Sequence, residues 1–127
     1  MEKDYSIFFQ LIRLGLGISD EAVGIPMEAW KGLYKEAERQ SMLGVVFEGV
    51  NRNVNLGGTK PPTALVLKWM GISQVIKRKN VKFDVEAKRL TQLFDENGIF
   101  TVILKGQGNE LLYPVRGCRI PGDIDIF

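Results

Sequence analysis

The stretch that organises the rest of the chain is its last six residues, Gly122-Asp123-Ile124-Asp125-Ile126-Phe127. Its two acids alternate with apolar residues, and successive side chains of a strand point to opposite faces. We therefore expect Asp123 and Asp125 on one face, about 7 Å apart, with Ile124 and Ile126 turned toward a core. Two carboxylates so placed favour a divalent cation, and Mg²⁺ binds carboxylates together with substrate phosphates. Taken alone, the pattern also fits acids on a solvated strand face.

A glycine-bearing turn lies just upstream of this strand. The run from Thr101 to Pro114 predicts a strand, a turn that contains Gly106, and then a short helix. A turn at the start of a helix presents free backbone N–H groups to an anion. Arg116 and Arg119 follow, before the acidic strand. The sequence therefore predicts a turn that suits phosphate beside a strand that suits a metal.

Together these motifs resemble the opening of the active site in the DNA polymerase beta-type nucleotidyltransferase superfamily. The resemblance is strongest to a bacterial group of uncharacterised nucleotidyltransferases, and it covers most of the chain. The signature of that group corresponds here to Leu104-Lys105-Gly106, Tyr113-Pro114, Arg116 or Arg119, and Gly122-Asp123-Ile124-Asp125. One departure is Gly106-Gln107, where the superfamily usually has Gly-Ser or Gly-Gly.

The resemblance implies a metal-dependent transfer of a nucleoside monophosphate from a nucleoside triphosphate to an acceptor hydroxyl. Asp123 and Asp125 would be the catalytic metal ligands, joined by a third acid from a later strand. Together they would hold two divalent ions, Mg²⁺ or Mn²⁺, which align the triphosphate for in-line attack. The sequence does not name the acceptor.

The resemblance also implies residues that contact the substrate. Gly106 and Gln107 stand at the triphosphate-binding turn, and basic side chains would neutralise phosphate charge. An alternative for Lys105 is a structural ion pair with Glu110. The expected substrate-binding set is Lys105, Gly106, Gln107, Arg116 and Arg119.

Because the third acid is expected after Phe127, we interpret the chain as an N-terminal fragment that is inactive by itself. The alternative is a degenerate binding or regulatory module that has no catalysis and self-associates. Exposed strand edges and apolar faces favour association, so we expect a homodimer.

Composition narrows the chemistry further. The chain has 127 residues, 45% of them hydrophobic, which suffices for one core. A net charge of +2 is too small to predict nucleic-acid binding. Without histidine there is no imidazole base or ligand, and the single cysteine, Cys118, excludes an internal disulfide or a cysteine zinc cluster. We expect a cytoplasmic protein, because neither a signal peptide nor a membrane-spanning apolar run is present.

The expected fold class is α+β and mostly helical. A helical region would occupy residues 1–97, and the truncated start of a nucleotidyltransferase catalytic domain would occupy residues 98–127, in strand-helix-strand order. One long helix, or two nearly continuous ones, is expected from Thr63 to Asn97, and strands are expected near residues 99–104 and 123–127. The side chains expected to face the core from helices are Ile7, Phe8, Leu11, Leu14, Trp30, Leu33, Tyr34, Ala37, Phe83, Ala87, Leu90 and Phe94.

Three further segments have two interpretations each. Trp30 and Tyr34 favour core packing over a base-stacking platform. Gly57-Gly58-Thr59-Lys60 favours a surface loop, because it lacks the spacing of a phosphate loop and no strand precedes it. Lys77-Arg78-Lys79-Asn80-Val81-Lys82 favours a solvated helix face over a contact with phosphate.

Overall fold

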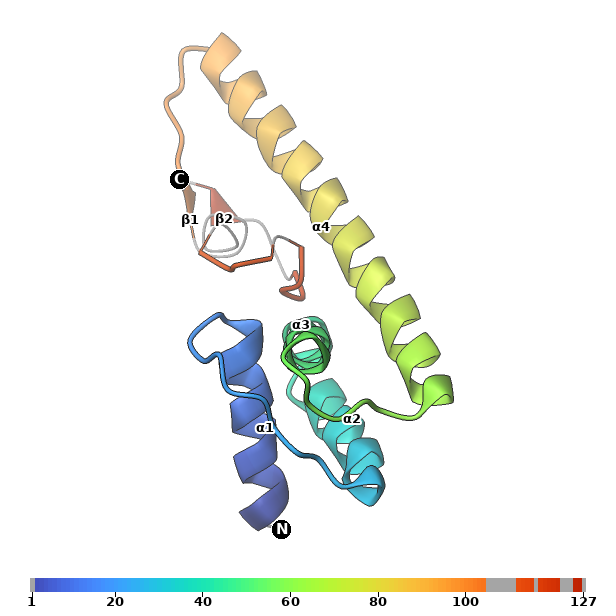
Figure 1. Ribbon diagram of the computed structural model, residues 1–127. Coiled ribbons are helices and arrows are strands. Elements are labelled where there is room, and N and C mark those ends of the chain that lie inside the picture. Colours follow the sequence, from blue (N-terminus) through green and yellow to red (C-terminus); the bar gives the residue numbers. More distant parts are fainter. Residues whose placement is uncertain (1, 105–111, 116, 122–124, 127) are drawn as a thin grey trace.

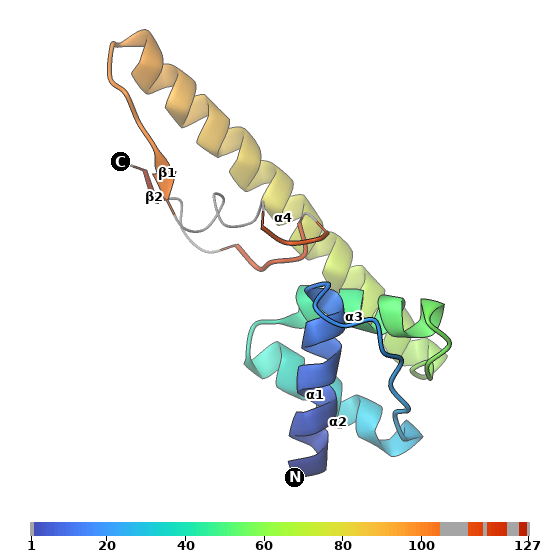
Figure 2. The same cartoon turned by 60° about the vertical axis from the view of Figure 1, so that its left-hand side comes forward.

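The computed structural model describes residues 2–104, 112–115, 117–121 and 125–126 (Figure 1). Its elements, in chain order, are α1 (Glu2–Gly15), the 3₁₀ turn η1 (Met27–Ala29), α2 (Trp30–Arg39), α3 (Leu43–Asn55), α4 (Thr63–Glu96), β1 (Ile103–Leu104) and β2 (Asp125–Ile126). Helix α3 lies between α1 and the first half of α4, and α2 packs against α1 and α3. The second half of α4 extends beyond these three helices (Figures 1 and 2).

The expected α+β class is wrong, because the part of the chain that the structure describes is helical. β1 and β2 have two residues each and form one antiparallel pair, far short of a strand-helix-strand sheet. The expected strand over residues 99–104 is confined to its last two residues. A strand needs a neighbour along its edge and cover on its apolar face, and Phe100 remains 89% exposed. The nearly continuous run of apolar residues therefore over-predicted the strand.

The core lies where the four helices meet, and it confirms the helical stripes expected for the first half of the chain. Trp30 and Tyr34 are buried, so they belong to this core and form no base-stacking platform. The segment after α1, from Ser19 to Pro26, is an irregular loop. The buried core side chains include Phe8, Leu11, Leu14, Trp30, Leu33, Tyr34, Ala37, Val46, Phe47, Val50, Trp69 and Ile76.

Helices α1 and α3 cross at very short range. A Cβ atom on Gly49 would overlap the carbonyl oxygen of Leu11, and one on Gly15 would overlap that of Val45. Glycine, whose side chain is a single hydrogen atom, is required at both positions for the two backbones to approach this closely. Gly15 is the last residue of α1 and also a point of its contact with α3.

Helix α4 is a single helix of 34 residues, as expected from the absence of proline over this range. Trp69 anchors its first half: the indole Nε1 donates to the carbonyl oxygen of Leu43 at 2.9 Å, and the ring packs edge-on against Tyr34 at 5.1 Å between centroids. The helix ends as predicted, with Gly98 at a φ of 74° and the Ile99 N–H donating to the Phe94 carbonyl at 2.8 Å.

The buried amide of Asn53, in α3, contacts the loop before η1 and the loop between α3 and α4. Its Oδ1 accepts from the Val23 N–H at 2.6 Å, and its Nδ2 donates to the Val23 carbonyl at 3.1 Å and to the Thr59 carbonyl at 3.4 Å. Thr59 Oγ1 accepts from the Ile25 N–H at 2.8 Å. The Gly57-Gly58-Thr59-Lys60 run is therefore a connector that ties two loops together, as the spacing indicated.

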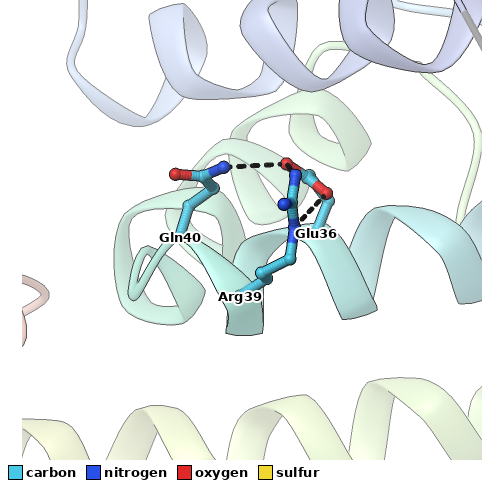
Figure 3. A network of polar contacts seen from close by, with 3 residues as sticks. All are labelled: Glu36, Arg39 and Gln40. Carbon is cyan, nitrogen blue, oxygen red and sulfur yellow. Dashed lines mark hydrogen bonds and ion pairs between the residues drawn. The ribbon is translucent and has the colours of Figure 1, made fainter.

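A surface network joins three side chains at the end of α2 (Figure 3). Arg39 donates to both oxygens of Glu36, at 3.1 and 2.7 Å, and Gln40 donates to Oε1 at 3.0 Å. The hydrogen bond from Arg39, followed by that from Gln40, lowers the pKa of Glu36 below its ordinary value.

Among the described residues, no helix is both long enough and apolar enough to cross a membrane.

Candidate functional site

The structure describes two of the predicted site residues, Asp125 and Arg119. Asp125 begins β2, where its backbone is the antiparallel partner of Leu104 in β1. Leu104 immediately precedes the predicted phosphate turn in the sequence. The other predicted site residues lie outside the described part of the chain: Lys105, Gly106, Gln107, Arg116 and Asp123.

Arg119 belongs to a short stretch, residues 117–121, that we call the arginine segment. This segment lies directly on α3, since a Cβ atom on Gly44 would overlap the carbonyl oxygen of Cys118. Cys118 itself is 1% exposed. The segment begins at Gly117, whose φ of 83° favours glycine. The arginine segment is therefore part of the folded core and not a surface loop.

Helix α4 holds the same segment through Asn80, a residue whose basic neighbours predicted a solvated face. Asn80 is 1% exposed. Its Nδ2 donates to the carbonyl oxygens of Gly117 at 3.0 Å, Arg119 at 2.6 Å and Ile76 at 3.1 Å. The solvated-face interpretation is right for the basic neighbours Arg78 and Lys79, which are exposed, but wrong for Asn80.

A sequence signal for Asn80 did exist. Trp69, Ser73, Ile76, Asn80 and Ala87 are buried on α4 at spacings of three, four and seven residues, which mark one face of a helix. An asparagine in such a stripe is typical of a buried amide with backbone partners. The basic residues around Asn80 concealed that pattern.

The guanidinium of Arg119 has an unusual environment. The side chain is half-buried, and its Nη1 is buried with no hydrogen-bond partner among the described residues. Asn80 Oδ1 is likewise buried and unpaired within that part of the chain. A buried donor that makes no hydrogen bond costs free energy, and a charged one costs more. This nitrogen is therefore a donor that an anion could satisfy.

Lys77, a basic side chain of α4 near the arginine segment, forms an ion pair. Lys77 Nζ lies 3.5 Å from Glu48 Oε1 on α3. Lys77 also contacts the start of the arginine segment, since a Cβ atom on Gly117 would lie 3.3 Å from its Cγ. Lys77 is therefore a structural cation between α3, α4 and the segment.

The described residues by themselves offer no ready-made metal centre. Among them, no group of three His, Cys, Asp or Glu side chains could hold an ion. A pocket of about 560 Å³ lies between α3 and the start of α4, lined by residues that include Phe47, Val54, Lys60 and Val66. Neither of the described site residues, Arg119 and Asp125, lines it.

Comparison with known proteins adds one finding. The model of a protein family described as "Uncharacterised nucleotidyltransferase" matches residues 26–127. The match spans every element from η1 to β2, and so includes Asn80 and the arginine segment. No curated protein and no solved structure matches the chain significantly.

Proposed function

Since the chain belongs to the family of uncharacterised nucleotidyltransferases, we propose that it binds a nucleoside triphosphate and serves metal-dependent transfer of a nucleoside monophosphate to an acceptor hydroxyl. The arginine segment and β2 carry the described part of this site. Lys105, Gly106, Gln107 and Arg116 would add further contacts to the triphosphate.

The observation that carries the proposal is the unpaired Nη1 of Arg119. A guanidinium presents its N–H donors as a planar fork that matches the oxygens of a phosphate. Arg119 keeps one donor buried and unpaired among the described residues, and a triphosphate oxygen would supply the missing acceptor. Because the backbone of the arginine segment is held by Asn80 and seated on Gly44, little ordering remains to oppose binding.

Asp123 and Asp125 would hold the divalent ions. The donor chemistry suits this role, because carboxylate oxygens are the ligands that Mg²⁺ and Mn²⁺ prefer. When bound, such ions neutralise the phosphate charge that develops during transfer. The chain's own contribution would be two acids, of which Asp125 begins β2 opposite Leu104.

The test begins with the binding of a fluorescent nucleoside triphosphate in the presence of Mg²⁺. Arg119→Ala should weaken binding about 10- to 100-fold, the range for a hydrogen bond to a charged group. Arg13→Ala removes the same charge from an exposed position on α1 and should leave binding unchanged. Equal affinity of Arg119→Ala and the parent would refute the role of Arg119.

Transfer of labelled nucleotide is the second measurement, made on the protein and on Asp125→Asn. This variant should bind the nucleotide with weaker dependence on Mg²⁺, and any transfer by the parent should fall by orders of magnitude. If Asp125→Asn transfers as fast as the parent, Asp125 is not a metal ligand. Binding without transfer to any acceptor would instead favour the non-catalytic module.

A further inference from the structure

We propose that Asn80 is a positioning residue for the nucleotide site: its buried carboxamide holds the arginine segment on α4 and so fixes the guanidinium of Arg119. This inference rests on the proposed function, because Arg119 is the group proposed to bind the triphosphate. Asn80 itself would touch neither nucleotide nor metal.

The hydrogen bonds of Asn80 flank Cys118. Its Nδ2 donates to the carbonyl before Cys118, that of Gly117, and to the carbonyl after it, that of Arg119 itself. Fixing both peptide groups leaves the backbone between them little freedom to rotate. The shorter bond, 2.6 Å, is made to Arg119, so the residue proposed to bind phosphate is the one held most closely.

The chemistry of the contact requires an amide nitrogen. All three acceptors around Nδ2 are carbonyl oxygens, those of Ile76, Gly117 and Arg119. An aspartate at position 80 would place a carboxylate oxygen against these carbonyls, which repel it. An alanine would take this donor away from both segment carbonyls, and the loss of a buried hydrogen bond is costly.

The opposite side of the segment makes a different kind of contact. There the carbonyl of Cys118 is seated against Gly44, with no room for a Cβ atom. That close packing stops the segment from moving toward α3, but packing alone is not directional. Asn80 therefore supplies a directional attachment to α4, and Gly44 supplies the seat on α3.

A second buried asparagine provides a matched comparison. Asn53 is as buried as Asn80 and also binds loop backbone, but it uses both ends of its amide, Oδ1 and Nδ2. Asn80 leaves Oδ1 unpaired within the described part of the chain. Asn53 joins two loops remote in sequence from the arginine segment. Replacing Asn53 should therefore reduce stability without disturbing Arg119.

The first readout is the reaction of Cys118, the single cysteine, with a small aromatic disulfide under native conditions. Cys118 is 1% exposed, so its reaction reports opening of the arginine segment. Asn80→Ala and Asn80→Asp should speed the reaction about 10- to 100-fold, the factor for losing two buried hydrogen bonds. Asn53→Ala should speed the reaction of Cys118 only by the factor by which it raises the globally unfolded fraction, which urea unfolding measures.

The second readout is nucleotide affinity in a double-mutant cycle with Arg119. Asn80→Ala should weaken binding of the Mg²⁺–nucleotide about tenfold in the parent and have no further effect when Arg119 is already alanine. Asn53→Ala should leave affinity unchanged in the folded protein. A merely structural Asn80 would give the same loss with or without Arg119.

The outcomes separate the two proposals. If Asn80→Ala opens the segment but leaves nucleotide affinity intact, the positioning role is refuted while nucleotide binding stands. An unchanged rate at Cys118 refutes the attachment itself. A parent that binds no nucleotide refutes the proposed function and the positioning role with it, and the rate at Cys118 then still decides whether Asn80 attaches the segment.

Discussion

At the scale of single residues, this protein depends on glycines where two backbones touch. Gly15 and Gly49 let α1 approach α3, and Gly44 lets the arginine segment lie on α3. Each contact uses the carbonyl oxygen of the neighbouring backbone, which cannot rotate away as a side chain could. A methyl group at any of these positions must therefore displace a whole segment.

We predict that Gly44→Ala lowers the free energy of unfolding by about 1–3 kcal/mol, the usual cost of overpacking, because its Cβ would overlap the Cys118 carbonyl. Urea unfolding measures this change. Gly32→Ala on α2 is the control, since a Cβ there meets no atom within 4 Å; it should raise stability by about 0.5–1 kcal/mol. A Gly44→Ala protein as stable as the parent would contradict the close seating of the segment on α3.

Residue-level inference from the sequence succeeded where helical spacing favoured the core. Trp30 and Tyr34 recur at that spacing and are buried. The prediction for Asn80 failed because two patterns overlap there. The basic cluster indicates a solvent-exposed face, whereas the apolar spacing along α4 indicates the core. Charge at the neighbouring positions was given too much weight, although those side chains point to other faces of the helix.

At the scale of elements, α2 carries a network whose strength depends on pH. The folded-state pKa of Glu36 lies below its ordinary value because Arg39 and Gln40 bind the carboxylate. The sign follows: the ionised form stabilises the folded state above the ordinary pKa of about 4.3, and this contribution is lost as pH falls through the lower folded-state value. The effect is small, because exposed pairs are screened by solvent.

We therefore predict that Glu36→Gln is slightly less stable than the parent near neutral pH and equally stable in acid. Thermal unfolding, followed by circular dichroism from neutral to acid pH, measures the difference in stability between the two proteins. Arg39→Ala should reproduce the loss, and the double variant should add little to either change. A gap between parent and Glu36→Gln that stays constant into strong acid would show that Glu36 acts through packing and not through its charge.

Elements were predictable from the sequence to different degrees. The long helix α4 and its glycine end were expected, because proline is absent between Thr63 and Asn97 and Asn97-Gly98 is a typical terminator. The strands were expected over longer ranges than the two residues each that pair, because strand formation depends on partners far away in the sequence. Ile99 and Phe100 are apolar like strand residues yet remain exposed, so local pattern alone could not decide them.

At the scale of the whole molecule, α4 has two different environments. In its first half Trp69, Ser73, Ile76 and Asn80 are buried, whereas in its second half Ala87 is the one buried residue among those described. Figures 1 and 2 show this second half beyond α1–α3, with the β1–β2 pair alongside it. One continuous helix therefore joins the core to the candidate site.

We predict that amide hydrogen exchange is slower over residues 67–80 than over residues 81–96, because local stability follows burial. Exchange followed by mass spectrometry on peptides from each half measures the contrast. Ile76→Ala should accelerate exchange in the first half, whereas Val85→Ala, at an exposed position, should leave that half unchanged. Uniform protection along α4 would mean that its second half is covered in solution.

The candidate site also contains residues that the sequence predicted and residues that it did not. The acids, the turn and the arginines were predicted from sequence because their residue types and spacing indicate chemistry, and they stay predictions. Gly44 and Asn80 were not, since a glycine under a carbonyl and an amide between two carbonyls have meaning only once α3, α4 and the arginine segment are brought together.

The continuity of α4 also limits how this protein can change in length. Trp69, in the core, and Asn80, at the arginine segment, stand eleven residues apart on one face of the helix, about three full turns. A single residue inserted between them would swing Asn80 about 100° around the helix axis and shift it about 1.5 Å along it. Exposed positions such as Arg78 and Lys79 can vary freely in type. The number of residues in this interval cannot, because every insertion or deletion would detach the arginine segment without altering any residue that contacts it.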